Sequence, residues 1–217
     1  MHLYIGNKLY SSWSLRPWVA MTALNIPFAE TIISLSDPDF KRRVSAVSEA
    51  GLVPVLVDGD VKVWETLAIL EYLAETFPEK AVWPSDRAAR AHARAIAAEM
   101  HAGFSGLRSA CPMNLGKRFA RRDRGADVTA NVERFCTLVR QARSRFGEPA
   151  SGPYLYGAFS AADAMYAPLV TRVDTYDLEV DSITRTYMDA VLASDAFQKW
   201  LAAALQEDWI VAEDEVD

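Results

Sequence analysis

The first eighty residues alternate between short apolar stretches and amphipathic stretches, which is the pattern of strands separated by helices. Residues 2–5 and 28–35 predict strands, and residues 14–24 and 38–47 predict helices. Residues 51–75 then add a strand, a hairpin, a second strand and a longer helix with almost no intervening loop. The first part of the chain is therefore predicted to mix strands and helices around one sheet.

A proline stands inside the third apolar run. Residues 52–57 predict a strand although they include Pro54, because proline is tolerated at a strand's first residue, especially after a cis peptide bond. Asp58-Gly59 predicts a type I′ hairpin, whose two central residues need positive φ. Alternating apolar residues at 61 and 63 predict the returning strand.

The helix that follows this hairpin opens on Glu65-Thr66. Its apolar residues recur near helical spacing at Leu67, Leu70, Leu73 and Phe77. The complete order of this part, β-α-β-α-β-β-α, is the order that a thioredoxin-like fold requires. We therefore assign residues 1–78 to a thioredoxin-like domain and residues 79–86 to a linker.

Strand signals almost disappear after residue 85, so residues 87–217 predict an all-helical second domain. An alanine-rich helix is expected from Ser85-Asp86 to about residue 108. Ser160 and Asp163 have capping-box spacing at the start of another helix, which Pro168 should bend or shorten. The remaining helices are expected at residues 128–146, 182–192 and 195–206.

Composition and charge narrow the class of protein. Of 217 residues, 51% are hydrophobic, yet no run approaches the 18 apolar residues of a membrane span, and the N-terminus lacks the pattern of a secretory signal. Two cysteines make no disulfide framework, so a soluble cytoplasmic protein is expected.

The charge is distributed unevenly along the chain. Residues 81–150 carry 13 basic and 6 acidic side chains, and residues 151–217 carry 3 basic and 13 acidic side chains. We interpret the basic region as facing the acidic third of this chain or of a partner rather than nucleic acid. Residues 212–217 are expected to be a frayed acidic tail.

The first loop and the helix after it offer candidate catalytic side chains. They read Ser11-Ser12-Trp13-Ser14-Leu15-Arg16, with two hydroxyls before a predicted helix. Serines at this place are also common helix caps. The three histidines, His2, His92 and His101, have no metal-ligand spacing, and no metal is expected.

These motifs together resemble serine-type, bacterial-type members of the cytosolic glutathione S-transferase family. The resemblance rests on Val53-Pro54, Glu65-Thr66 and the first loop, and it covers essentially the whole chain in the family's order of domains. Zeta-class members of that family carry Ser-Ser-Cys-Ser-x-Arg in this loop, where this chain has Trp13 in place of the cysteine.

The resemblance implies a glutathione site. Val53, before a cis Pro54, would pair its backbone with the cysteine of glutathione, and Glu65 and Thr66 would hold the γ-glutamyl end. The chemistry agrees, because backbone beside a proline can bind an extended peptide and a carboxylate suits an ammonium group. Ser11, with Ser12 close behind, would be catalytic by hydrogen bonding to the glutathione thiol.

A serine in this role activates the sulfur of the cosubstrate. A free thiol with a pKa of about 8.5 is only about 3% thiolate at pH 7. A hydroxyl hydrogen bond and a helix N-terminus, the latter worth about 0.3–1 kcal/mol, together make a fall of about two pKa units attainable. No base or metal is needed for this step.

The function expected from this resemblance is transfer of glutathione to small electrophiles, with peroxide reduction as a further activity. Trp13 in place of the cysteine favours this reading over the alternative, a zeta-type glutathione-dependent isomerase. A non-catalytic glutathione- or protein-binding module is the second alternative. The family implies a homodimer, and neither nucleic acid nor a membrane is expected as a partner.

Two parts of the site stay open at this level. The glycine carboxylate of glutathione could meet Lys41, Arg42 or Arg43. An apolar wall for the electrophile could come from Tyr10, Trp13, Met100, Phe104 and Met113, although core packing explains each of them equally well.

Overall fold

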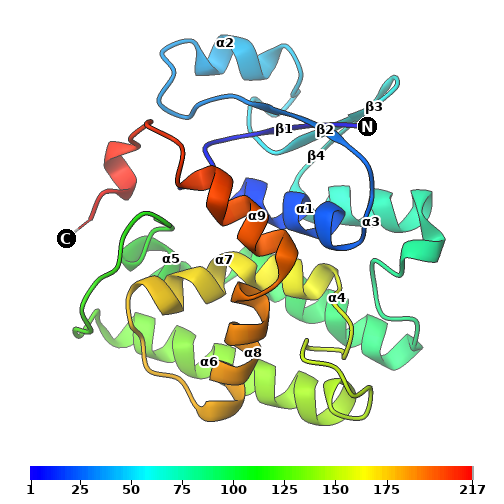
Figure 1. Cartoon of the computed structure of the whole chain (residues 1–217), viewed down its shortest axis with the longest axis vertical. Coiled ribbons are helices and arrows are strands. Elements are labelled where there is room, and N and C mark those ends of the chain that lie inside the picture. Colours follow the sequence, from blue (N-terminus) through cyan, green and yellow to red (C-terminus); the bar gives the residue numbers. More distant parts are fainter. Residues whose placement is uncertain (217) are drawn as a thin grey trace.

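The computed structural model describes residues 1–216 and divides into a sheet with flanking helices and a helical bundle (Figure 1). The four-stranded sheet has the order β2-β1-β3-β4. Its strands are β1 (His2–Ile5), β2 (Ala29–Ile32), β3 (Val55–Asp58) and β4 (Val61–Trp64). β1 runs parallel to β2 and antiparallel to β3, and β3 runs antiparallel to β4. This is the predicted thioredoxin-like arrangement.

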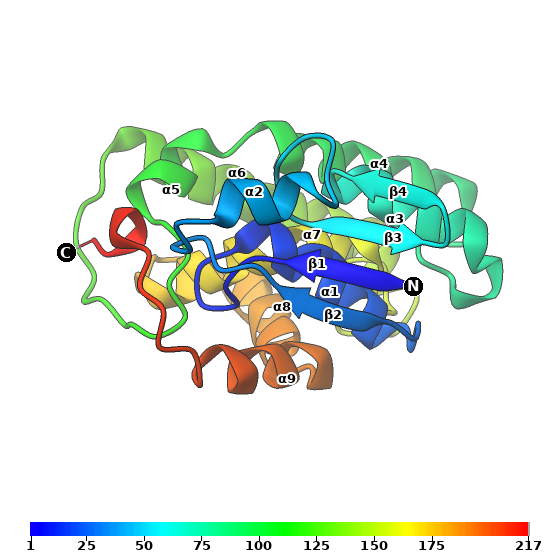
Figure 2. The same cartoon turned by 90° about the horizontal axis from the view of Figure 1, so that it is seen from above.

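Three helices accompany the sheet, namely α1 (Ser12–Ala23), α2 (Phe40–Ser45) and α3 (Thr66–Thr76). α1 and α3 lie between the sheet and the helical bundle, whereas α2 lies on the opposite side (Figures 1 and 2). α1 packs against α3 and against two helices of the second part, α7 and α9. The N-terminal end of α1 is thereby fixed where the two parts of the chain meet.

The strand predictions hold with two corrections of detail. The strand predicted over residues 28–35 ends at Ile32, because β1 is only four residues long and leaves nothing to pair with beyond one last bond from Ile33 N–H to the Ile5 carbonyl, 2.8 Å. β3 begins directly after Pro54, and the Val53-Pro54 peptide bond is cis.

The hairpin type was predicted wrongly. Asp58 pairs with Val61, so the two central residues are Gly59 and Asp60 rather than Asp58 and Gly59. Only Gly59 has positive φ, +59°, and glycine at the first central position is typical of a type II′ turn. The aspartate belongs to the strand, where its carboxylate accepts a hydrogen bond from the Tyr72 hydroxyl, 2.9 Å.

The second part is helical throughout, as predicted. Its elements are α4 (Arg87–Ala102), α5 (Ser105–Ala110), α6 (Ala126–Ala142), α7 (Ala161–Thr175), α8 (Ser182–Leu192) and α9 (Asp195–Ala204). Short 3₁₀ turns, η1 (Pro78–Lys80) and η3 (Ala212–Asp214), precede and follow this bundle, and a π turn, η2 (Arg143–Gly147), extends α6. None of the helices in residues 1–216 is long and apolar enough to span a membrane.

The alanine-rich helix predicted to reach residue 108 stops earlier. α4 ends at Ala102, and Phe104 takes a left-handed conformation, φ +59°, before α5 begins. The Phe104 ring is buried and meets Tyr166 edge to face at 6.1 Å. Burial of one large ring therefore overrides the helical propensity of the surrounding sequence.

α7 is the central helix of the bundle and is almost completely buried. Its capping box is confirmed: the Asp163 carboxylate accepts the backbone N–H of Ser160 at 2.8 Å and its hydroxyl at 3.0 Å, and also the N–H of Leu155 at 3.0 Å. Burial raises the pKa of Asp163 to about 6. Pro168 does not shorten α7, which continues to Thr175.

The basic region faces the acidic third of the same chain, as one of the two interpretations predicted. Arg118 lies 2.9 Å from Asp174, and Arg121 lies 3.2 Å from both Asp177 and Glu179. These contacts tie the segment between α5 and α6 to the C-terminal end of α7 and to the loop after it. The fraying predicted for residues 212–217 is wrong for the described part, where residues 212–214 form η3 and the next residue binds the first loop; Asp217 lies outside the described residues.

Candidate functional site

The N-terminal end of α1 holds both candidate catalytic serines. Ser11 is the N-cap: its Oγ accepts the Ser14 backbone N–H at 3.3 Å and donates to the Ser14 Oγ at 2.7 Å. The Ser14 Oγ in turn accepts the N–H of Gly6 at 3.0 Å. In this arrangement the Ser11 hydroxyl donates its proton to Ser14, so it must rotate away from Ser14 before it can donate to a ligand.

Ser12 has a different neighbour. Its Oγ accepts a hydrogen bond from Nη2 of Arg172 in α7, 3.4 Å away, which leaves the Ser12 proton free to donate. Both serines are buried, with 7% and 8% of their surface exposed. The sequence left the choice between them open. In the structure Ser11 is the N-cap of α1, whereas Ser12 has a hydroxyl proton that is free to donate to a ligand.

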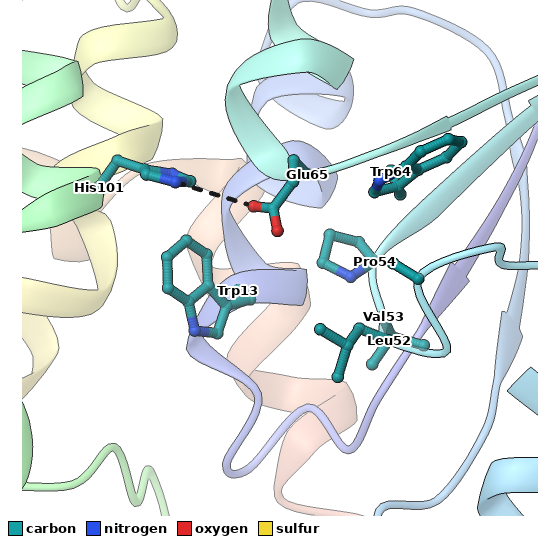
Figure 3. A pocket seen from close by; sticks show the side chains of 8 residues that line it. Trp13, Leu52, Val53, Pro54, Trp64, Glu65 and His101 are labelled. Atoms are coloured by element: carbon teal, nitrogen blue, oxygen red, sulfur yellow. Dashed lines mark ion pairs between the residues drawn. The ribbon is translucent and has the colours of Figure 1, made fainter.

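A pocket of about 370 Å³ opens beside this helix end (Figure 3). It is lined by Trp13, Ala50, Leu52, Val53, Pro54, Trp64, Glu65 and His101. The structure therefore brings together Val53, Pro54 and Glu65, which the sequence placed in one ligand site. Ser11 and Ser12 are not among the lining residues, but they directly precede Trp13, which is.

Thr66 lies behind this pocket rather than in it. It is completely buried, and its hydroxyl donates to the Trp13 carbonyl oxygen, 3.5 Å. That contact joins the first turn of α3 to the first turn of α1. Thr66 can therefore position the two helix ends that border the pocket.

Glu65 reaches into the pocket from an unusual backbone conformation. Its φ of +68° and ψ of 128° are rare for a residue with a side chain, and such conformations concentrate at functional sites. Its carboxylate is half exposed and lies 3.8 Å from Nε2 of His101 at the end of α4 (Figure 3). A cationic group entering the pocket would meet this carboxylate.

Trp13 stands at the centre of a cationic cluster that the sequence did not reveal. The guanidinium carbons of Arg16 and Arg108 lie 4.2 and 5.0 Å from its ring centroid, and the ring of His101 meets it edge-on at 5.2 Å. Arg16 is only 1% exposed, and its Nε and Nη1 have no hydrogen-bond partner in the described chain. Burial, together with Arg172 and Arg108, lowers the pKa of Arg16 to about 9.

Arg172 completes this cluster from α7. It is 6% exposed, and its Nε donates to the Cys111 carbonyl at 2.9 Å. Burial, with a smaller effect of Arg108, lowers its pKa to about 10. Within residues 1–216 no carboxylate lies within 4.0 Å of Arg16, Arg108 or Arg172. Buried cations are normally paired, so this cluster favours an anionic ligand.

Other candidates from the sequence lie elsewhere. Tyr10, Met100, Phe104 and Met113 are buried in the core, so of the predicted apolar wall only Trp13 lines the pocket. For the glycine carboxylate, Arg42 and Arg43 pair with Asp39 and Asp37 at 2.6 and 2.5 Å, Lys41 is exposed, and none of the three lines the pocket.

Three functional candidates were missed by sequence reasoning, namely His101, Arg108 and Arg172. Arg172 had a usable signal, because a single arginine in the apolar run of α7 needs a polar partner or a ligand. His101 and Arg108 lie near the break between α4 and α5, which was not predicted. In the part of the chain that the structure covers, no three His, Cys, Asp or Glu side chains gather as metal ligands would.

A thioredoxin-like domain followed by a helical bundle, with a pocket at the cis-proline, defines the glutathione S-transferase class of fold. A family model described as the glutathione S-transferase N-terminal domain matches residues 10–76. A probable maleylacetoacetate isomerase from Caenorhabditis elegans is 30% identical and is aligned over 79% of this chain and 81% of its own length. The chain belongs to the glutathione S-transferase family.

Further relatives include zeta-class proteins. Maleylpyruvate isomerase from a Ralstonia species is 26% identical over 91% of this chain and 97% of its own length. A solved structure of a maleyl pyruvate isomerase, a bacterial zeta-class member, has a TM-score of 0.68 and 24% identity and covers 96% of this chain and 99% of its own. A glutathione transferase homologue from Burkholderia with bound glutathione has a TM-score of 0.71 at 22% identity and covers 95% and 98%. These structural similarities establish the fold.

Proposed function

We propose that this protein is a glutathione-dependent isomerase of the zeta type, acting on a small anionic substrate with a cis carbon–carbon double bond conjugated to a carbonyl group. Isomerisation thereby replaces the transfer of glutathione to electrophiles, which the sequence favoured, as the main proposed function. The relatives that extend over most of the chain include proteins named maleylacetoacetate and maleylpyruvate isomerase.

The observation that carries this proposal is the cluster of Arg16, Arg108 and Arg172 beside the serine loop. Three cations that have no carboxylate of residues 1–216 within 4.0 Å make a poor environment for a neutral hydrophobic electrophile. A substrate carboxylate would supply the missing counter-charge and form charge-assisted hydrogen bonds with the guanidinium groups. Such bonds also fix the orientation of a planar acid relative to the attacking sulfur.

In the proposed reaction, the glutathione thiolate adds to one carbon of the double bond, and the electron pair moves to the conjugated carbonyl oxygen as an enolate. The former double bond is now single and rotates. Collapse of the enolate reforms the double bond in the trans geometry and expels the thiolate. Glutathione is regenerated, and no atom is gained or lost by the substrate.

We assign the residues around the cosubstrate as follows. Val53 pairs its backbone with the cysteine of glutathione, and Glu65 accepts from its α-ammonium. The Thr66 hydroxyl is engaged with the Trp13 carbonyl, so it is the backbone N–H of Thr66, at the N-terminal end of α3, that meets the α-carboxylate. Ser11 donates to the thiolate, and Ser12, whose oxygen already accepts from Arg172, is the second candidate. Developing negative charge on the enolate oxygen is stabilised by the same arginine cluster.

Conjugation of glutathione to other electrophiles, with peroxide reduction, is the second candidate function. It is favoured by Trp13, which stands where the zeta pattern has a cysteine and lines the pocket with a large apolar surface. We also propose that the protein acts as a cytoplasmic homodimer, as the family resemblance implies. Glutathione binding without turnover would leave the non-catalytic module as the remaining alternative.

The test compares substrates on one enzyme preparation. Maleylacetone reports isomerisation, a halogenated nitrobenzene reports conjugation, and a hydroperoxide reports reduction. The proposal requires maleylacetone to have the highest kcat/KM of the three. A higher value for the halogenated nitrobenzene would favour the transferase, and failure to bind millimolar glutathione by calorimetry would exclude both enzymes.

A further inference from the structure

The ring of Trp13 contacts two arginines that come from different domains. Trp13 lies in the first turn of α1, and its side chain forms part of the pocket wall (Figure 3). Arg16 follows three residues later on the same helix, a spacing that places both side chains on one face. Arg108 reaches the ring from α5 in the helical bundle. The two guanidinium carbons lie 4.2 and 5.0 Å from the ring centroid, within the range of cation–π contacts.

The ring and the second arginine are both held where α1, α3, α4 and α5 meet. The Thr66 hydroxyl donates to the Trp13 carbonyl oxygen at 3.5 Å, and the ring of His101 meets the indole edge-on at 5.2 Å. Nη1 of Arg108 donates to the carbonyl oxygens of His101 and Gly103, each 3.4 Å away. These contacts restrain the indole ring and the Arg108 guanidinium relative to each other.

An aromatic ring differs from a carboxylate as a partner for arginine. A carboxylate orients a guanidinium by hydrogen bonds, but it also neutralises the charge and occupies N–H donors. A ring attracts the cation through its quadrupole, leaves the net charge unchanged and does not use the donors in the guanidinium plane. Within residues 1–216, neither Arg16 nor Arg108 has a carboxylate within 4.0 Å, and Nε and Nη1 of Arg16 have no partner. Trp13 therefore holds two arginines whose charge is not compensated.

We propose that Trp13 is a positioning residue for substrate binding: its indole ring holds Arg16 and Arg108 as unpaired cations and thereby determines the preference of the site for anions. The identity of the anion, a small planar carboxylate, rests on the proposed function. The cysteine of the zeta-class pattern has no ring and cannot hold an arginine in this way. The large side chain of Trp13 thus serves the charged part of the substrate through the two arginines.

Trp64 offers a matched comparison in the same pocket. It is the last residue of β4 and lines the pocket, but within residues 1–216 no lysine or arginine lies over its ring. If the two tryptophans were only apolar walls, weakening the quadrupole of either ring would leave anion binding unchanged. If Trp13 holds the arginines, only the change at Trp13 affects anion binding.

The first experiment compares the dianion fumarate with fumaramide, a neutral molecule of similar shape. Both Kd values are measured by calorimetry with saturating S-methylglutathione. Site-specific incorporation of a polyfluorinated tryptophan at position 13 withdraws electron density from the ring and largely keeps its shape. The Kd for fumarate should then rise about three- to ten-fold, as expected for a weakened cation–π contact, while the Kd for fumaramide stays within error. The same replacement at position 64 should change neither Kd.

A double-mutant cycle in urea tests the contact without any ligand. Arg16→Met should raise the unfolding midpoint by more in a Trp13→Leu background than in the wild-type protein, because the cation has lost its ring in that background. In a Trp64→Leu background, the shift caused by Arg16→Met should equal the shift in the wild-type protein.

An unchanged Kd for fumarate on fluorination at position 13, or equal shifts of the urea midpoint in the three backgrounds, would overturn the role of Trp13. Failure of the wild-type protein to bind fumarate would exclude both this role and the proposed function. If both measurements follow the expectation but maleylacetone is not isomerised, Trp13 positions the arginines and the proposed function fails. If maleylacetone is isomerised but fluorination leaves fumarate binding unchanged, the proposed function stands without this role of Trp13.

Discussion

Replacing Arg16 with methionine should make the protein more stable and less active toward anionic substrates. Arg16 is 1% exposed, and its pKa is lowered from 12.5 to about 9, chiefly by burial. At 1.36 kcal/mol for each pKa unit, the folded state disfavours the charged form by about 5 kcal/mol. Stacking on the Trp13 ring at 4.2 Å offsets up to about 2 kcal/mol of this cost.

Methionine retains a flexible apolar side chain of similar length and removes the unpaired charge. We therefore expect the free energy of unfolding at pH 7 to rise by about 1–3 kcal/mol, and Tm to rise by about 2–4 °C for each kcal/mol. The sign follows from linkage. The pKa of Arg16 is lower in the folded state than in the unfolded state, so its charge destabilises the wild-type protein fully below about pH 9. This destabilisation decreases as the pH rises through that value, because the folded protein then releases the proton.

Activity should change in the opposite direction. Loss of one charge-assisted hydrogen bond, about 1.5–3 kcal/mol, predicts a fall of about ten- to hundred-fold in kcat/KM for maleylacetone. Urea unfolding and steady-state kinetics measure both quantities. Arg42→Met, at an exposed arginine paired with Asp39, is the matched control and should alter stability by no more than about 1 kcal/mol.

A lower Tm in Arg16→Met together with unchanged kinetics would refute this reasoning. That result would mean that Arg16 supports the fold through contacts that methionine cannot replace, and that its charge does not serve the substrate. A gain in stability together with a loss of activity in Arg16→Met is what we expect of a buried arginine that is held ready for an anionic substrate.

Three further outcomes follow from the same structure. Ser11→Ala should raise the pKa of the bound glutathione thiol by about one to two units, measured by thiolate absorbance against pH, while an equal effect confined to Ser12→Ala would move the role to Ser12. Glu65→Gln should weaken glutathione binding about ten-fold by calorimetry, and an unchanged Kd would remove Glu65 from the site. Asp163→Asn should lower the free energy of unfolding by about 2–4 kcal/mol in urea, because the amide cannot accept all three hydrogen bonds of the carboxylate, and a loss below about 1 kcal/mol would contradict its role as a buried cap.

The fold could be predicted because its signals are local. Alternating apolar residues define the strands, and Pro54 marks the start of β3 within a few residues. Ser160 and Asp163 predict the start of α7, because the capping-box motif lies within four consecutive residues. The break at Phe104 could not be predicted, since it depends on burial of that ring against a helix sixty residues later.

The candidate site likewise contains residues that a local motif predicts and residues that only the tertiary fold brings together. Val53 and Glu65 are close in sequence and share one pocket, so a local motif was enough to find them. Only the tertiary fold brings Arg108 beside Trp13 and Arg172 beside Ser12, and the sequence carries no spacing that links these residues. For that reason the sequence indicated the thiol cosubstrate but left the electrophile undetermined, whereas the positive charge in the structure supports an anionic substrate.

Proton NMR of maleylacetone with a small fraction of an equivalent of glutathione tests the central claim most directly. An isomerase regenerates its cosubstrate, so we expect complete conversion to the trans isomer with the glutathione signals unchanged at the end. Conversion that stops after one equivalent of glutathione, with a stable conjugate accumulating, would contradict the isomerase and restore the transferase.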